Sequence, residues 1–211
     1  MSTTSDPRTL VLHGLRLKGF ADAAAIAEAA GVSEADTKPQ LDALVDGELA
    51  NYREGRLSGY ALTPAGRAEH ARLVAEELEA SGQRAAVQAA YERFLGINQD
   101  LLTICTAWQL RDVAGESVVN DHTDPAHDAE VIGRLADLHA KVAPICADLG
   151  AALLRFGAYG DRLGDALARV QAGDVDWFTK PMIASYHTVW FELHEDLLCT
   201  LGIERSAEGS G

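Results

Sequence analysis

Two histidines and two large aromatic residues near the C-terminal end of the chain have the spacing of a ligand-binding helix face. His187, Trp190 and His194 fall on one side of a predicted helix, beside Tyr186. Aromatic rings can stack on an organic molecule while imidazoles bind its polar groups. We therefore expect this face to line a small-molecule site, together with two residues of a second helix, Asn98 and Trp108.

A core helix is the alternative interpretation of this face. Its histidines would then bond to neighbouring carboxylates, and Asn98, the polar exception on a buried stripe, would be satisfied internally. A third interpretation is an enzyme that uses His187 and His194, with a metal whose further ligand would be His122, His127 or His139. We do not expect an enzyme, because the sequence contains no nucleophile–base–acid set, phosphate-binding loop or paired metal motif.

Acidic residues gather in two places, and we expect a simple structural role for both. On the far side of the last helix, three of them should form a solvated face: Glu192, Glu195 and Asp196. Upstream, four residues are dense enough to hold a divalent cation: Asp121, His122, Asp124 and His127. However, Asp124 directly precedes Pro125, which is typical of a helix cap. We therefore predict no metal or other cofactor.

The elements of the N-terminal part are defined by their capping residues. Gly31 ends a predicted helix over 20–30, and Ser33 caps the next helix, over 33–46. Alternating residues around 49–62 then predict a two-stranded hairpin, after which Thr63 and Pro64 begin another helix. Two helices joined by a turn, followed by a hairpin and a helix, predict a winged helix-turn-helix.

The junction between the hairpin and the following helix resembles that of MarR-like bacterial regulators. The resemblance rests on Tyr60, on Leu62-Thr63-Pro64 and on Gly66-Arg67, and covers roughly residues 1–80. It implies a winged-helix fold and double-stranded DNA as a partner. In such a complex the helix over 33–46 would present Thr37, Lys38 and Gln40 to the bases, and the wing would meet its groove through Arg53 and Arg56.

The charge of the chain keeps a second interpretation open. The net charge is −14, and the predicted recognition helix carries Glu34, Asp36 and Asp42 against Lys38 alone. Residues 1–80 contain eight Lys and Arg against thirteen Asp and Glu, a net charge of −5. Because DNA affinity depends on phosphate neutralisation, this domain could instead be a winged helix that no longer binds DNA and serves as a small-molecule-binding or protein-interaction module.

The rest of the chain is predicted to be helical. We expect helices over 83–112, 125–156 and 161–171 and a last one after Pro181, with a loop over 113–125 and strands only in the wing. The fold class is therefore mainly α, with a winged helix-turn-helix domain over 1–80, an all-α helical bundle domain over 81–205, and a disordered tail over 206–211.

This organisation predicts a ligand-responsive transcriptional regulator. An effector bound in the helical domain would change the geometry of two DNA-binding domains in a homodimer, which we expect to form along the helical tract 64–112. The N-terminus is polar and no apolar run is long enough to span a bilayer, so we expect a cytoplasmic protein without a membrane partner.

Overall fold

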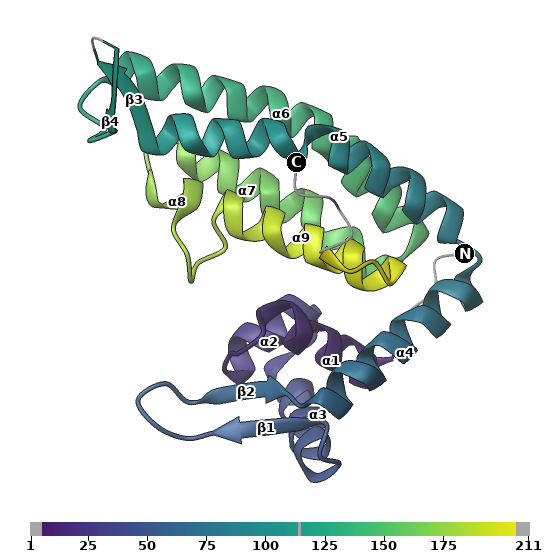
Figure 1. Cartoon of the computed structure of the whole chain (residues 1–211). Coiled ribbons are helices and arrows are strands. Elements are labelled where there is room, and N and C mark those ends of the chain that lie inside the picture. The colour runs from purple at the N-terminus through teal and green to yellow at the C-terminus, as the bar shows by residue number, and fades with distance from the viewer. Residues whose placement is uncertain (1–5, 114, 206–211) are drawn as a thin grey trace.

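The computed structural model describes residues 6–113 and 115–205, so the tail over 206–211 lies outside the described residues. The fold is mainly helical, with two small antiparallel sheets of two strands each (Figure 1). The N-terminal elements are α1 (Pro7–Lys18), α2 (Ala23–Ala30), α3 (Glu34–Asp46), β1 (Ala50–Arg53), β2 (Gly59–Leu62) and α4 (Pro64–Ser81). They are followed by α5 (Arg84–Gln109), β3 (Leu110–Val113), β4 (Glu116–Val119), α6 (Pro125–Ala152), the 3₁₀ helix η1 (Leu154–Ala158), α7 (Tyr159–Gln171), α8 (Asp176–Thr179) and α9 (Tyr186–Leu201).

Capping residues end and begin the N-terminal elements where the sequence predicts. Gly31 adopts a left-handed conformation with φ of 63°, and the Ser33 side chain accepts from the Asp36 N–H at the start of α3. Thr63 caps α4 in the same way by accepting from the Gly66 N–H. Strands β1 and β2 pair in antiparallel register. A first hydrophobic core joins these elements: Val11, Leu12, Leu15, Ile26, Leu41, Leu44, Ala50, Tyr60 and Leu62.

A second, larger hydrophobic core lies between the helices of the C-terminal part. The long helices α5 and α6 lie side by side, and α7 and α9 cover them (Figure 1). No helix among residues 6–113 and 115–205 combines the length and the apolar character needed to cross a membrane.

Several predicted boundaries are wrong. The predicted helix over 83–112 ends at Gln109, because strand β3 follows it and pairs with β4 in the predicted loop over 113–125. The expectation of strands only in the wing is therefore wrong. The hairpin turns at Gly115, whose φ is +88° and whose N–H donates to the Asp112 carboxylate. Helix α6 ends at Ala152 rather than at Phe156. The last helix begins only at Tyr186, because Ser185 supplies its cap.

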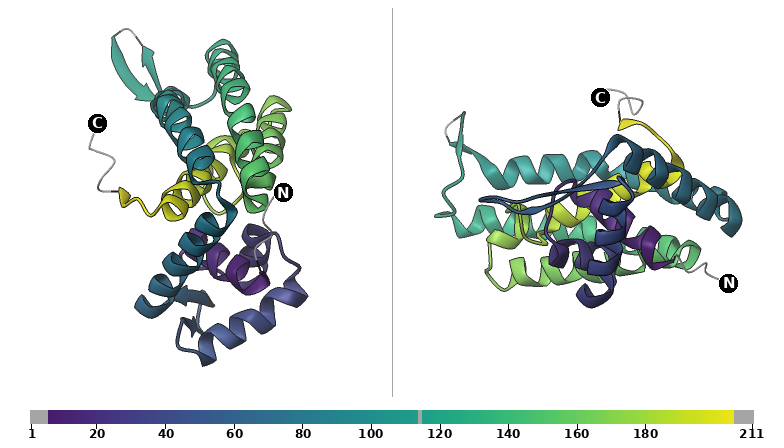
Figure 2. Two further views of the ribbon diagram at one scale, coloured as in Figure 1. Left: turned by 90° about the vertical axis from the view of Figure 1, so that its right-hand side faces the viewer. Right: turned by 90° about the horizontal axis from the view of Figure 1, so that it is seen from below.

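The arrangement of the two cores gives α9 an unusual position. Helices α1 and α2 lie on the side of the N-terminal part that faces the bundle, whereas α3 and the hairpin β1–β2 lie on the far side (Figures 1 and 2). Both α1 and α4 contact α9. Helix α9 is therefore covered by the bundle on one side and by the N-terminal elements on the other.

Candidate functional site

The residues predicted to contact DNA differ in their exposure. Thr37 is fully buried, so the expectation that it faces bases is wrong. Its spacing from Leu41 and Leu44 places it on the inward stripe of α3. Lys38 is exposed and forms an ion pair of 3.4 Å with Asp42, while Gln40 is half-buried.

The two arginines of the predicted wing are both exposed. Arg56 lies in the segment between β1 and β2, and Arg53 is the last residue of β1. The guanidinium of Arg53 stands 5.7 Å from the centre of the Phe20 ring, a cation–π contact that orients the side chain. These four residues belong to α3 (Lys38 and Gln40) and to the hairpin β1–β2 (Arg53 and Arg56), which lie away from the bundle (Figure 1).

The predicted ligand-binding face of α9 is part of the bundle core. Tyr186, Trp190 and His194 are buried, and the Phe94 ring lies 4.8 Å from Trp190 and 5.2 Å from His194. The indole Nε1 of Trp190 donates to the Asn98 Oδ1 at 2.9 Å, so Asn98 is satisfied internally. These side chains fill the space that an effector would need, and they do not form the wall that we expected.

The two remaining residues of the expected pocket are buried or half-buried. Trp108 is buried and stacks on Phe178, with ring centres 4.3 Å apart. His187 is half-buried, and burial lowers its pKa. The core interpretation of this face is therefore the one that the observed contacts support.

Each residue of the possible cation cluster has its own partner. Asp124 caps α6, as the sequence predicts, and Asp121 accepts from Thr123 and Arg111. The His122 ring lies 3.1 Å from the Asp128 carboxylate, and the His127 Nε2 lies 2.8 Å from the Ala107 carbonyl oxygen. Among residues 6–113 and 115–205, no three His, Cys, Asp or Glu side chains converge on a point where a metal could bind.

The acidic side of α9, predicted to be solvated, is instead buried against the N-terminal part. Asp196 is 1% exposed and Glu192 is 3% exposed. The Asp196 carboxylate pairs with the Arg155 guanidinium, with the His13 Nε2 at 3.1 Å and with the Tyr159 hydroxyl, which donates at 3.1 Å. These partners come from η1, α1 and α7, so one carboxylate connects elements of both cores.

Arg155 is the cationic centre of this buried network. Besides Asp196, its guanidinium binds Glu77 of α4 at 2.9 Å and donates to the Thr200 hydroxyl at 2.5 Å. The guanidinium also lies over the Phe156 ring, 4.6 Å from the ring centre. With its side chain only 3% exposed, Arg155 needs these partners to offset the loss of water.

A second carboxylate joins the two parts of the chain at the edge of the network. Glu192 accepts from Lys18 of α1 and from Arg162 of α7, both at 2.6 Å. Nearby, Arg16 of α1 pairs with Glu195 at 2.6 Å. The acidic residues of α9 thus hold α1 through three contacts, made by His13, Arg16 and Lys18.

Two stacked histidines extend the network into α4. The His13 Nδ1 lies 2.8 Å from the His70 Nε2, and the two rings are nearly parallel. Burial, followed by the charges of His13, Arg16 and Arg155, lowers the pKa of His70 to about 3. Burial raises the pKa of Asp196, but Arg155 and His13 outweigh it and hold that pKa well below its ordinary value.

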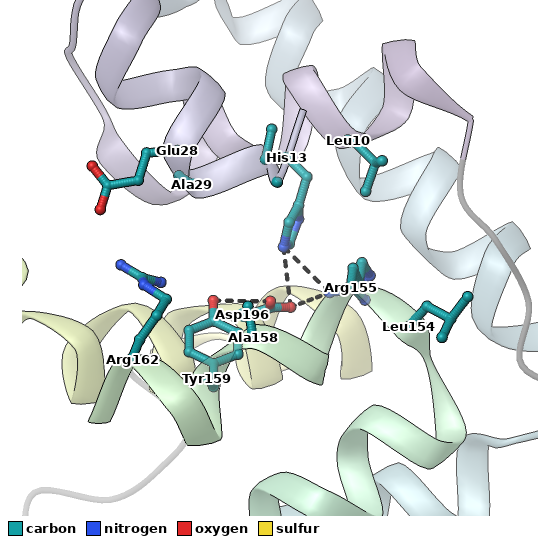
Figure 3. A pocket seen from close by; sticks show the side chains of 12 residues that line it. Leu10, His13, Glu28, Ala29, Leu154, Arg155, Ala158, Tyr159, Arg162 and Asp196 are labelled. Carbon is teal, nitrogen blue, oxygen red and sulfur yellow. Dashed lines mark hydrogen bonds and ion pairs between the residues drawn. The ribbon is translucent and has the colours of Figure 1, made fainter. Parts of the chain in front are cut away.

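A cavity of about 280 Å³ lies beside the network, between the two cores (Figure 3). On the N-terminal side it is lined by the end of α2 and the turn into α3, from Glu28 to Gly31, with Leu10 and His13 of α1. On the other side are Leu154 and Arg155 of η1, Tyr159 and Arg162 of α7, and Asp196 of α9. The cavity therefore has charged and apolar walls that come from both cores.

Sequence reasoning missed this site because its members are far apart in the chain. Arg155 and His13 are separated by 142 positions, and Arg155 and Asp196 by 41. Two signals could have indicated it. Glu192, Asp196 and Thr200 follow one another at intervals of four on one helix face, and His13 interrupts an apolar stripe of α1.

No family model, no curated protein and no solved structure matches this chain.

Proposed function

We propose that the protein is a ligand-responsive, DNA-binding transcriptional regulator whose N-terminal elements form a winged helix-turn-helix. The observation that carries the proposal is the position of α3 and the hairpin β1–β2. They lie side by side on the face away from the bundle, whereas α1 and α2 face the bundle (Figures 1 and 2). A recognition helix and a wing must be free on one common face if a duplex is to reach both.

The contacts with DNA would come from four of the five predicted residues. Lys38 and Gln40 of α3 would reach the major groove, while Arg53 and Arg56 would contact phosphates or the minor groove beside the wing. Two copies would bind a palindromic site as a homodimer formed along α4 and α5, and the protein would act in the cytoplasm.

Ligand control would act at the junction between the two cores instead of inside the bundle. The network of Asp196, Arg155 and His13 fixes α1 to the bundle, and the adjoining cavity touches the turn that leads into α3. A molecule bound there would change the position of the reading helix relative to the bundle. On the aromatic side of α9, by contrast, Tyr186, Trp190 and His194 are buried.

A second candidate is a winged-helix protein that binds a small molecule or another protein but not DNA. It is favoured by the ion pair between Lys38 and Asp42, which neutralises a cation of α3, and by the burial of Thr37. The net charge of −5 over residues 1–80 also favours this candidate, because it opposes binding to DNA phosphates.

Selection from random duplex DNA at low salt distinguishes the two candidates. We expect enrichment of a palindrome with half-sites about ten base pairs apart. On that site, Arg53→Ala with Arg56→Ala should weaken binding and reduce the slope of log affinity against log salt by up to about two. The control replaces two exposed bundle cations that lie outside α4 and α5, Lys141→Ala with Lys180→Ala, and should leave the slope unchanged. If no sequence is enriched, the second candidate is correct.

A further inference from the structure

The charged lining of the cavity between the two cores includes a carboxylate and a guanidinium that shares its anion, Glu192, with a second cation. Glu28 on α2 and Arg162 on α7 both line it, and Figure 3 shows them at the same end, on opposite walls. Glu28 has no ion pair among the described residues, 6–113 and 115–205. From these charges we propose that the cavity binds a small zwitterion of the amino-acid type, with its protonated amine on Glu28 and its carboxylate on Arg162.

The guanidinium of Arg162 has donors to spare for a ligand carboxylate. Its Nη2 donates to Glu192, and its Nε has no hydrogen-bond partner within the part of the chain that the structure describes. A guanidinium has five N–H donors, and a carboxylate can accept two of them together. Glu192 keeps a second cation, Lys18, so Arg162 can turn toward a ligand without leaving Glu192 unpaired.

The other charged groups of the cavity are already matched to each other. Asp196 accepts from Arg155, His13 and Tyr159, and Arg155 also binds Glu77 and Thr200. A ligand with a net charge would therefore add an unbalanced charge beside a balanced network, at a cost in desolvation. A zwitterion adds none, because its two charges meet Glu28 and Arg162.

The size and the apolar walls of the cavity favour a short ligand. Its volume of about 280 Å³ lies just below the range of pockets that hold drug-sized molecules. The apolar part of the lining consists of small or aliphatic side chains: Leu10, Ala29, Ala30, Leu154 and Ala158. Leu10 and Leu154 lie at the other end of the cavity from Glu28 and Arg162 (Figure 3). These walls suit an amino acid with an aliphatic side chain.

Binding at this position would also explain how a ligand controls DNA, a consequence that rests on the proposed function. Glu28 to Gly31 are the last turn of α2 and the hinge into α3, and Gly31 holds the left-handed conformation of that hinge. A ligand that bridges α2 and α7 fixes this turn against the bundle. The free energy of this bridging contact would then couple ligand binding to operator binding.

Calorimetric titration of the full chain with each standard amino acid tests the proposal. We expect binding below about 10 mM for at least one aliphatic amino acid, and about tenfold weaker binding, or more, for its analogues that lack the amine or carry an amide in place of the carboxylate. Glu28→Gln, at an exposed position, should weaken binding by about the same factor. Its control, Glu34→Gln on α3, should bind as the wild type does.

Arg162→Gln is the second variant, and Arg169→Gln on the same helix is its control. Arg169 stacks on Trp177 and does not line the cavity. The proposal is overturned if no amino acid binds, if a singly charged analogue binds as tightly as the zwitterion, or if Glu28→Gln binds like the wild type. Amino-acid binding without any enriched DNA sequence would refute the proposed function and leave the ligand class standing, so the two can fail separately.

Discussion

The two sides of α9 have environments opposite to those that their residue types suggest. The side with Tyr186, Trp190 and His194 carries groups suited to a ligand, yet it is packed into the bundle core. The opposite side carries Glu192 and Asp196, which are usually solvated, yet these carboxylates are buried and bind cations from both parts of the chain. The two sides differ because one packs against the bundle and the other against the N-terminal part of the chain.

This difference shows that a buried carboxylate can indicate where two parts of a chain meet. Burying a carboxylate is unfavourable unless cations and donors surround it, and three elements besides α9 supply partners to Asp196. The contact therefore forms only when α1, η1, α7 and α9 are all in place. An apolar face such as that of Trp190 makes no comparable demand, because hydrophobic contact is not directional.

The largest effect is expected from the acidic side. Asp196→Ala should destabilise the protein by about 3–5 kcal/mol, because it leaves Arg155 and His13 buried without their shared anion. The free energy of unfolding is measured by denaturant titration. Asp148→Ala removes an acid of an exposed ion pair and should cost at most about 1 kcal/mol. Similar losses for the two variants would mean that Asp196 is solvated, as its residue type suggests.

An intermediate effect is expected from the aromatic side. Trp190→Phe removes the donor to Asn98 while keeping an aromatic ring, and should cost about 1–3 kcal/mol through the unpaired amide oxygen and the space that is left. The neighbouring Phe191 is 49% exposed, so Phe191→Leu should change the free energy of unfolding by less than about 0.5 kcal/mol. If Trp190→Phe were equally neutral, the aromatic side would again be a candidate ligand wall.

The sequence predicted local elements well where capping chemistry is explicit. Gly31, Ser33 and Thr63 lie where a cap or a left-handed residue is needed, and each acts there as expected. The hairpin β3–β4 was missed because its strands, Leu110–Val113 and Glu116–Val119, show no clear alternation of polar and apolar residues. Its turn depends on Gly115 and on one Asp112 contact, which resemble any loop.

The site was predicted far less well than the elements, for a physical reason. Helical periodicity shows which residues share a face, but not which neighbour covers that face. Thr37 was assigned to DNA although it shares a stripe with Leu41 and Leu44, and its spacing could have corrected that assignment. The pairing of Asp196 with Arg155 and His13 has no local signal, because it depends on how the two cores meet.

The smallest expected effect is the pH dependence of stability that His70 contributes. It tests the buried network and not the aromatic side of α9. Burial lowers the pKa of His70 to about 3, whereas an unfolded histidine titrates near its usual value of about 6.5. Below a pH of about 6.5, His70 binds a proton in the unfolded chain but stays neutral in the folded chain. The contribution of His70 to the free energy of unfolding is therefore fully present above this pH and is lost as the pH falls. As the pH falls from about 7.5 to about 6, protonation of His70 in the unfolded chain should lower the free energy of unfolding by about 1 kcal/mol.

The matched variant for this effect is His70→Gln, since Gln can still bond to His13 but does not titrate. Burial also lowers the pKa of His139 and His187, so these residues give a slope of the same sign in both proteins. Asp196 contributes only at much lower pH, because its pKa is lowered from an already acidic value. The difference in the pH dependence of unfolding between wild type and His70→Gln therefore isolates the network. Parallel curves would show that His70 is hydrated in the folded protein, and that the buried junction is less closed than the contacts of His13 and Asp196 indicate.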